Sequence, residues 1–459
     1  MVRWKIQSLI NMLRFSWVFY DLAGLACSAY LSHTRYFHLN PGPAIHFSRS
    51  LWCVIFVAFG IVLNYLWELY EPEILADAKQ ITTRLSFAGL TLGILIVLVN
   101  YVLFFPGVGR VILSSSVLGA LGWELGWRSV RARHFRSRGR QKVLIAGNGE
   151  LVDEICSLLA SSNHYPYVVA AIASSDGSGQ SSTDIPLINL SEVSRAVEEN
   201  NVKHILMAPG DRPDGHTLDR LIDCMRLGVR FHDACTFYEQ LTGRIPIRYV
   251  DHGWFLSQVQ SIGEPLFRQA KRTADFLLAL LGMVVTLPLG LIIALAIRLD
   301  SPGPVLFRQR RVGLNGRVFN LVKFRTMVVN AEKTGPVWAA SKDLRVTRVG
   351  SVLRRLRLDE LPQCWNILTG EMSFVGPRPE RPEFVEVLRG EIPFYGRRHL
   401  VRPGLTGWAQ VRFPYGASIE DARHKFEYDL YYVKNQSLVT DLLILGRTVS
   451  VVLGRRGSR

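Results

Sequence analysis

The sequence contains 459 residues, 48% of them hydrophobic and 20% charged. This length exceeds one ordinary core and predicts about three domains, and the apolar content excludes a disordered chain. Lys and Arg total 54 against 38 Asp and Glu, and the net charge of +16 favours anionic partners: nucleic acid, anionic lipid or phosphorylated substrates. The six cysteines include no CxxC pair, so they indicate reduced thiols rather than a zinc ribbon or a disulfide scaffold.

Residues 1–130 are predicted to form a four-helix transmembrane region, because a spanning helix needs about 20 mostly apolar residues. The apolar stretches run approximately over 16–33, 50–70, 85–105 and 111–127. Lys and Arg precede the first stretch and are dense from Arg128 to Lys142, which predicts that both flanks are cytoplasmic. A basic run beside a membrane is typical of topology signals and anionic-lipid contacts, so no nucleic acid partner is expected.

Asp21 places an ionisable side chain inside the first apolar stretch. Such a group within a membrane helix is a candidate for function. We interpret it instead as a contact between helices, because polar side chains also hold membrane helices together.

Residues 140–250 alternate strand-like and helical patterns, which predicts a parallel α/β sheet and a Rossmann-like module. The strand at 142–146 leads into Gly147 and Gly149, a tight turn before a helix where phosphate can bind. Val152 replaces the third glycine of the dinucleotide motif. The pattern leaves open a bound nucleotide and a nucleotide-binding fold kept as a structural or regulatory module.

A linker over 251–267 is followed by a fifth apolar segment, from Phe276 to Ile297. The segment is long enough to span a bilayer, but both of its flanks are basic and therefore both are expected in the cytoplasm. Pro288 removes a helix hydrogen bond in its middle. We therefore expect a re-entrant helix over about 273–299 that bends and returns.

Arginine-rich motifs follow residue 300, and they include an acidic pair, Asp359-Glu360. Arginines bind diphosphates through paired hydrogen bonds, and carboxylates among them suggest Mg²⁺. Adjacent side chains on a helix point about 100° apart, so the pair can share a site only at a helix end or turn, which Pro362 indicates. Alone, an Asp-Glu pair is more often solvated.

The segment from about 268 to 454 resembles the bacterial sugar transferase family, the monotopic phosphoglycosyl transferases. With the preceding helices and the Rossmann-like module, the chain resembles the large polyprenyl glycosylphosphotransferases of exopolysaccharide synthesis. The matching features are the Pro-kinked helix and the motifs SPGPVLF, KFRTM, LDELPQ, GPRP, RPGLTGWAQV and DLYYVKN. The expected fold is a membrane protein of α plus α/β class, with a mainly α catalytic domain over 268–459.

This resemblance implies transfer of a sugar 1-phosphate from a UDP-sugar to undecaprenyl phosphate, with release of UMP. UDP-glucose or UDP-galactose is the expected donor, and UDP-N-acetylated sugars stay open. The resemblance also implies a multi-pass protein of the bacterial inner membrane, with its catalytic domain on the cytoplasmic face and in contact with membrane lipids. Relatives suggest that the protein is a homodimer.

The resemblance also assigns roles to the acidic pair. Asp359 would be the nucleophile that carries a covalent phosphosugar, and Glu360 would hold Mg²⁺. Arg354 occupies the family's arginine position before the pair and would contact phosphate.

Other cations match the family with less defined roles in binding nucleotide or lipid phosphate. They are Lys323, Arg325, Arg378 and Arg402. For Lys323 and Arg325 a solvent-facing structural position is the alternative. Many relatives have an arginine where this chain has Pro414, and Arg412 is a candidate replacement.

Several alternatives stay open. The apolar tail 437–453 fits an interfacial amphipathic helix and a packed domain helix equally well. A non-catalytic scaffold or sensor of a polysaccharide assembly complex and a conventional glycosyltransferase that releases UDP are the other functions considered. A dehydratase or epimerase is disfavoured because residues 142–250 contain no Tyr-x-x-x-Lys.

Overall fold

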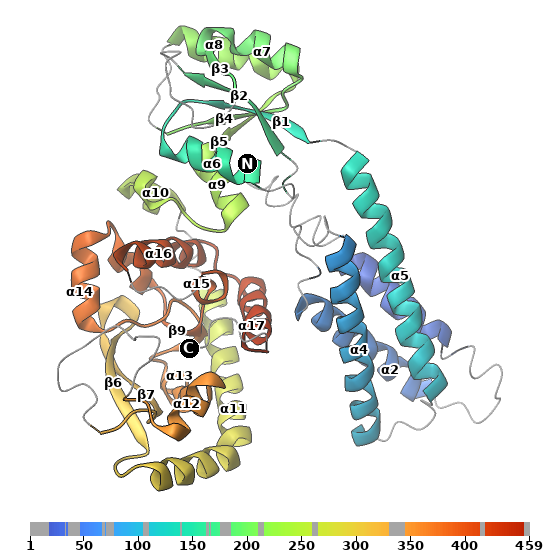
Figure 1. Cartoon of the computed structure of the whole chain (residues 1–459), viewed down its shortest axis with the longest axis vertical. Helices are drawn as coiled ribbons and strands as arrows, with labels where there is room; N and C mark the ends of the chain where they lie inside the picture. Colours follow the sequence, from blue (N-terminus) through green and yellow to red (C-terminus); the bar gives the residue numbers. More distant parts are fainter. Residues whose placement is uncertain are drawn as a thin grey trace. The chain divides into compact units, whose positions relative to one another are not determined.

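The computed structural model divides into two compact units, Met1–Phe237 and Tyr238–Arg459 (Figure 1). It describes residues 18–32, 34, 46–66, 69, 78–103, 110–137, 140–161, 165, 167–174, 185–209, 215–258, 265–329, 345–413 and 418–453.

The N-terminal region is helical where it is described. Residues 18–32 form a helix, followed by α2 (His46–Leu66), α4 (Ala78–Leu103) and α5 (Arg110–Ser137). Leu25, Phe56, Ile96 and Ile112 form a shared core of these helices. Their longest apolar runs, at Val18–Ser32, Cys53–Tyr65 and Ile81–Val97, are shorter than a membrane span. Four membrane-spanning helices therefore stay a prediction.

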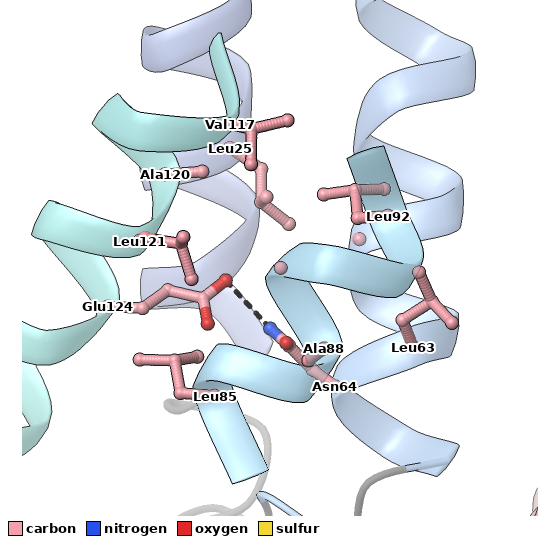
Figure 2. A pocket seen from close by; sticks show the side chains of 12 residues that line it. Leu25, Leu63, Asn64, Leu85, Ala88, Leu92, Val117, Ala120, Leu121 and Glu124 are labelled. Carbon is pink, nitrogen blue, oxygen red and sulfur yellow. Dashed lines mark hydrogen bonds between the residues drawn. The ribbon is translucent and has the colours of Figure 1, made fainter. Parts of the chain in front are cut away.

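Asp21 lies in a fully buried polar network between these helices. Arg128 of α5 donates to both of its carboxylate oxygens, at 3.0 and 2.8 Å, and Trp127 Nε1 donates at 2.9 Å. Asn64 of α2 donates to Asp21 and to Glu124 of α5. Figure 2 shows Asn64 and Glu124 as the polar pair of a pocket that is otherwise lined mainly by apolar side chains. The interpretation of Asp21 as a contact between helices is confirmed.

The Rossmann-like module contains the predicted parallel sheet, with strand order β3-β2-β1-β4-β5. Helices α7 and α8 cover one face and α6 covers the other (Figure 1). The strands are β1 (Gln141–Ala146), β2 (Tyr167–Ser174), β3 (Leu187–Asn189), β4 (His204–Met207) and β5 (Arg230–Asp233). The helices are α6 (Glu150–Ser161), α7 (Val193–Asn200), α8 (Gly215–Asp223) and, across the unit boundary, α9 (Ala234–Thr242).

The second unit begins at Tyr238, earlier than the expected linker at 251–267. The reason is packing: Ile245, Ile247 and Val250 share a core with Phe426 and Leu430. The strands of this unit are β6 (Leu306–Val312), β7 (Val318–Phe324), β8 (Ser373–Val375) and β9 (Gly404–Thr406). Its helices are α10 (His252–Gln258), α11 (Pro265–Asp300), α12 (Arg348–Arg355), α13 (Gln363–Thr369), α14 (Pro382–Glu391), α15 (Trp408–Arg412), α16 (Ile419–Lys434) and α17 (Leu438–Leu453).

Helix α11 contains the fifth apolar segment, with Pro288 inside it. Within the described residues it is the one helix long and apolar enough, by length and composition, to cross a membrane. Its ribbon changes direction partway along (Figure 1). Ala279 packs on Ile367 of α13, and Ile297 packs with Leu353 of α12. Both halves therefore contact the same unit, as a re-entrant helix requires, while its position in a membrane stays a prediction.

Candidate active site

The Asp359-Glu360 pair lies in a short 3₁₀ turn, Leu358–Glu360, just after α12. Arg357 precedes it with φ 54° and ψ 23°, a left-handed conformation that residues with a Cβ rarely adopt. This residue turns the chain out of α12, so the pair is not part of a continuous helix. The expected helix break is confirmed: the pair lies between the end of α12 at Arg355 and the start of α13 at Gln363, with Pro362 as the N-cap of α13.

Asp359 is buried, with 9% of its surface exposed. Within the described part of the chain its carboxylate makes no hydrogen bond or ion pair. Burial and the neighbouring charge of Glu360 raise its pKa, while the positive charges of Lys323, Arg354 and Arg378 lower it. The group is therefore a carboxylate held among three cations with no hydrogen bond from a described protein group, an arrangement suited to a nucleophile.

Glu360 points toward the GPRP loop that follows β8. Its Oε1 accepts a hydrogen bond from Arg378 at 3.0 Å and lies 3.8 Å from a terminal nitrogen of Arg357. Its Oε2 contacts no polar group among the residues that the structure describes. One oxygen is thus oriented by arginine and the other is available to a ligand.

Lys323 lies on β7, opposite Phe307 of β6, with its Nζ 5.3 Å from the centre of the Phe307 ring. Burial, with a smaller effect from the nearby charge of Arg311, lowers its pKa to about 8 against the opposing effect of Asp359. Lys323 therefore faces the acidic pair and not the solvent. Arg311 was missed in the sequence because it lies in no recognised motif.

Arg354 and Arg325 converge on the strand end that carries the KFRTM motif. Arg354 Nε donates to Thr326 Oγ1 at 2.9 Å. Arg325 is 4% exposed and donates to the carbonyls of Pro302 and Ser301, at 2.9 and 2.7 Å. These bonds explain the burial of Arg325 without any ligand, and its contact with phosphate stays a prediction.

Arg402 and Arg412 are not joined to the acidic pair by any described contact. Arg402 Nε donates to the carbonyl of Gly370, at the end of α13, at 3.0 Å. The Arg412 guanidinium lies 4.7 Å from the Trp408 ring centre. Pro414 lies outside the described residues. Phosphate binding by either arginine stays a prediction.

The backbones of the GPRP and RPGLTG motifs lie in direct contact with each other. Strands β8 and β9 pair in parallel, and Gly376 N donates to Thr406 O at 2.9 Å. A Cβ on Gly404 would lie 2.1 Å from Gly376 N, and one on Gly407 would lie 2.2 Å from Gly376 O. The glycines therefore allow the close approach that fixes the loop carrying Arg378.

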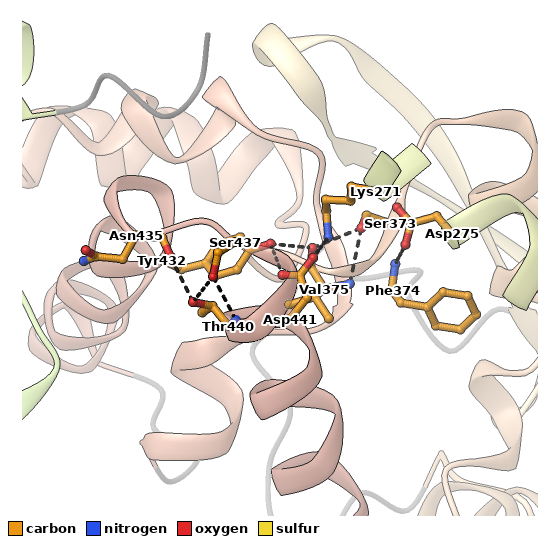
Figure 3. Close-up of polar contacts among 10 residues, drawn as sticks. All are labelled: Lys271, Asp275, Ser373, Phe374, Val375, Tyr432, Asn435, Ser437, Thr440 and Asp441. Carbon is orange, nitrogen blue, oxygen red and sulfur yellow. Dashed lines mark hydrogen bonds and ion pairs between the residues drawn. The ribbon is translucent and has the colours of Figure 1, made fainter. Parts of the chain in front are cut away.

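The C-terminal tail forms helix α17, whose inner face is packed. Figure 3 shows Lys271 of α11 and Tyr432 of α16 meeting at Asp441, and Tyr432 donates to it at 2.8 Å. Leu442, on the outer face, is 67% exposed. The reading as a packed domain helix is confirmed, and an interfacial role for the outer face stays a prediction.

The glycine turn of the Rossmann-like module has the expected tight geometry, with φ of 119° at Gly147 and 116° at Gly149, values that glycine adopts readily. Between them Asn148 donates to Ser174 Oγ at 3.4 Å, across the ends of β1 and β2. A nucleotide at this turn stays a prediction.

The acidic pair fits Mg²⁺ only as a site shared with substrate. Within the described residues no group of three His, Cys, Asp or Glu side chains could hold a metal ion. Mg²⁺ commonly binds one or two carboxylates and completes its shell with phosphate oxygens and water. Glu360 Oε2 and the nearby Asp359 meet that modest requirement.

Comparison with known proteins identifies relatives of the second unit. A family model described as bacterial sugar transferase matches residues 266–455. The UDP-N-acetylgalactosamine-undecaprenyl-phosphate N-acetylgalactosaminephosphotransferase of Aeromonas hydrophila is 47% identical, over 48% of this chain and 52% of its own length. The UDP-glucose:undecaprenyl-phosphate glucose-1-phosphate transferase of Xanthomonas campestris pv. campestris is 44% identical, over 41% of this chain and 40% of its own length. The exopolysaccharide production protein ExoY of Sinorhizobium fredii is 37% identical, over 45% of this chain and 95% of its own length.

The chain belongs to the bacterial sugar transferase family. The match spans about half or less of the Aeromonas and Xanthomonas proteins.

Proposed function

We propose that this protein transfers a sugar 1-phosphate from a UDP-sugar to undecaprenyl phosphate, releasing UMP, as the initiating step of exopolysaccharide synthesis. The observation that carries the proposal is Asp359: a buried carboxylate with no hydrogen bond among the described residues, in the field of three cations. The names of the Aeromonas and Xanthomonas relatives describe transfers of this class.

The reaction is two displacements at one phosphorus. A carboxylate oxygen of Asp359 attacks the β-phosphorus, the bond to the bridging oxygen breaks, and UMP leaves with that oxygen. The sugar phosphate remains bonded to Asp359. An oxygen of undecaprenyl phosphate then attacks the same phosphorus, which forms undecaprenyl-diphosphate sugar and restores the carboxylate.

Positive charge is the main requirement, because an anionic nucleophile must approach an anionic diphosphate. Lys323, Arg354 and Arg378 supply fixed positive charge around Asp359. Glu360, oriented by Arg378, is the proposed ligand of Mg²⁺. When bound, Mg²⁺ would supply further positive charge to the phosphate oxygens.

The proposed location is the bacterial inner membrane, with the catalytic unit on the cytoplasmic face and α11 as a re-entrant anchor in contact with lipid. Support comes from the exposed apolar side chains of α11, such as Leu281, Val285 and Ile292, each more than 60% exposed. Such a dense apolar surface is typical of a lipid contact. A homodimer is also proposed, from the resemblance alone.

The sugar is the variable that the experiment must resolve. The names of the relatives divide between N-acetylgalactosamine and glucose. The donors to be tested are therefore UDP-glucose, UDP-galactose and UDP-N-acetylated sugars.

The test uses the full chain in nanodiscs with undecaprenyl phosphate, Mg²⁺ and the panel of UDP-sugars. We expect lipid-dependent UMP from one sugar, and no UMP from Asp359→Ala. Glu420→Gln is the matched control, because Glu420 is an exposed acid on α16 with a side chain 55% exposed. Release of UDP would instead identify a conventional glycosyltransferase, and no nucleotide product from folded protein would favour the scaffold.

A further inference from the structure

The GPRP loop is held by two arginine side chains from distant parts of the second unit. Arg398 donates to the backbone carbonyl of Arg378 at 3.0 Å. Arg311 of β6 donates to the next carbonyl, Pro379, at 2.9 Å. Two consecutive peptide groups are thus fixed at the residue whose side chain reaches Glu360.

Arg398 is itself oriented by buried partners. It donates to Asp429 of α16 at 2.6 Å and to the hydroxyl of Tyr395 at 2.6 Å. Its side chain is 5% exposed and that of Asp429 is 3% exposed. The contacts therefore form a chain that runs from Asp429 through Arg398 to the backbone of Arg378.

Stability alone is a weak reason to bury this ion pair. Desolvation of two charges offsets most of their attraction, so buried ion pairs are often no more stabilising than apolar residues of the same size. Such a pair does impose direction, because a guanidinium donates in fixed directions and a charged partner limits its rotation. Here the terminal nitrogen that pairs with Asp429 also donates to the loop beside the acidic pair.

We propose that Asp429 and Arg398 are positioning residues, which hold the GPRP loop so that Arg378 orients Glu360 beside Asp359. This inference rests on the proposed function. It gives a role to the Asp of the DLYYVKN motif, which lies on α16 and has no described contact with the acidic pair.

The main test is Asp429→Asn, which keeps the size of the side chain and removes its charge. Loss of a group that orients an active-site side chain typically reduces activity 10–100-fold. We expect UMP release per folded molecule to fall by about this range, with the loss in kcat. The melting temperature should also fall, because the change breaks a buried ion pair, so activity is compared at equal concentrations of folded protein.

The matched control is Glu427→Gln. Glu427 lies two residues away on the same helix, is 8% exposed, and pairs with Arg244 at 3.6 Å rather than with the GPRP loop. The Glu427→Gln variant should therefore change the rate of UMP release less than about threefold, as expected of a substitution remote from the active site.

A double-mutant cycle separates positioning from general damage. In an Arg378→Ala background, Asp429→Asn should cause little further loss, because the side chain that the loop positions against Glu360 is already absent. Additive losses would overturn the proposal. Tyr395→Phe is a milder variant that removes one bond to Arg398, and it should give a smaller loss in the same direction if Asp429→Asn does not fold.

A binding measurement distinguishes failure of this inference from failure of the proposed function. UMP with Mg²⁺ should raise the melting temperature of the native protein, and less so for Asp429→Asn. If the native chain binds UMP in this way but releases none from any sugar, the proposed function fails and the positioning role stands. If the native chain is active and Asp429→Asn matches it in kcat and in UMP binding, the positioning role fails alone.

Discussion

Two buried carboxylates, Asp21 and Asp359, lie near positive charge in different units and differ in how many hydrogen bonds they accept. Both oxygens of Asp21 accept from Arg128, and Trp127 and Asn64 add further bonds. Asp359 has three cations in range and, among the described residues, no hydrogen bond. A saturated carboxylate stabilises a fold, whereas one with available lone pairs retains the capacity to attack or to bind a ligand.

The largest expected effect is on activity, from Asp359→Asn. The amide is a very poor nucleophile, so UMP release should fall at least about 10³-fold. The melting temperature should stay the same or rise, because the substitution removes a buried charge that has no hydrogen bond of its own. The measurement is UMP release together with thermal denaturation, and retained turnover would contradict the nucleophile assignment.

The matching change in the other unit, Asp21→Asn, should act on stability and not on chemistry. The change leaves Arg128 buried with Glu124 as a remaining charged partner. Breaking a buried ion pair typically lowers the free energy of unfolding by about 3–5 kcal/mol. Thermal denaturation of the solubilised protein should show the loss, while kcat per folded molecule stays native. A specific loss of kcat with unchanged stability would mean that the Asp21 network takes part in function.

The pH profile of kcat should show that the cluster around Asp359 titrates. Attack requires the carboxylate form, so burial should place the acidic limb above the usual range of an aspartate pKa. Burial lowers the pKa of Lys323 to about 8, so its positive charge is present below that pH and is lost above it. Activity should therefore decline above pH 8.

Lys323→Arg is the control for the alkaline limb, because arginine keeps its charge throughout this range. The variant should lose the decline above pH 8, whatever its absolute rate. An unchanged alkaline limb would assign that limb to another group.

The smallest effect concerns backbone strain beside the acidic pair. Arg357 has φ 54°, which costs a residue with a Cβ about 1 kcal/mol, while glycine adopts it freely. Arg357→Gly should raise the free energy of unfolding by no more than about 0.5 kcal/mol, after the greater freedom of glycine in the unfolded chain is subtracted. Denaturant unfolding of the variant measures this, and a clear destabilisation would show that the contact of Arg357 with Glu360 outweighs the strain.

Much of the site could be predicted from short motifs. Asp359, Glu360, Arg354 and Lys323 were identified by residue type and family resemblance, and Lys323, Arg354 and Arg378 do act electrostatically on Asp359. Arg325 matched a motif equally well, yet its described bonds go to the backbone at the end of α11. A motif specifies which residue is present, but not which groups its side chain will bind.

The partners that orient the site could not be predicted. Arg311 lies 68 residues before the carbonyl that it binds, and Asp429 lies 31 residues after Arg398. No local pattern relates such positions, because their contact depends on how β6, α16 and the GPRP loop pack together.

The sequence by itself determined the helices of the N-terminal region, the parallel sheet, the long apolar α11 and the acidic pair, because each depends on periodicity, hydropathy or a short motif. Only the tertiary structure decided that Asp21 is saturated and Asp359 is not. It also decided that Arg402 lies at the end of α13 while Arg398 holds the loop of Arg378. The physical reason is that hydrogen-bond saturation and burial are properties of groups brought together from distant parts of the chain.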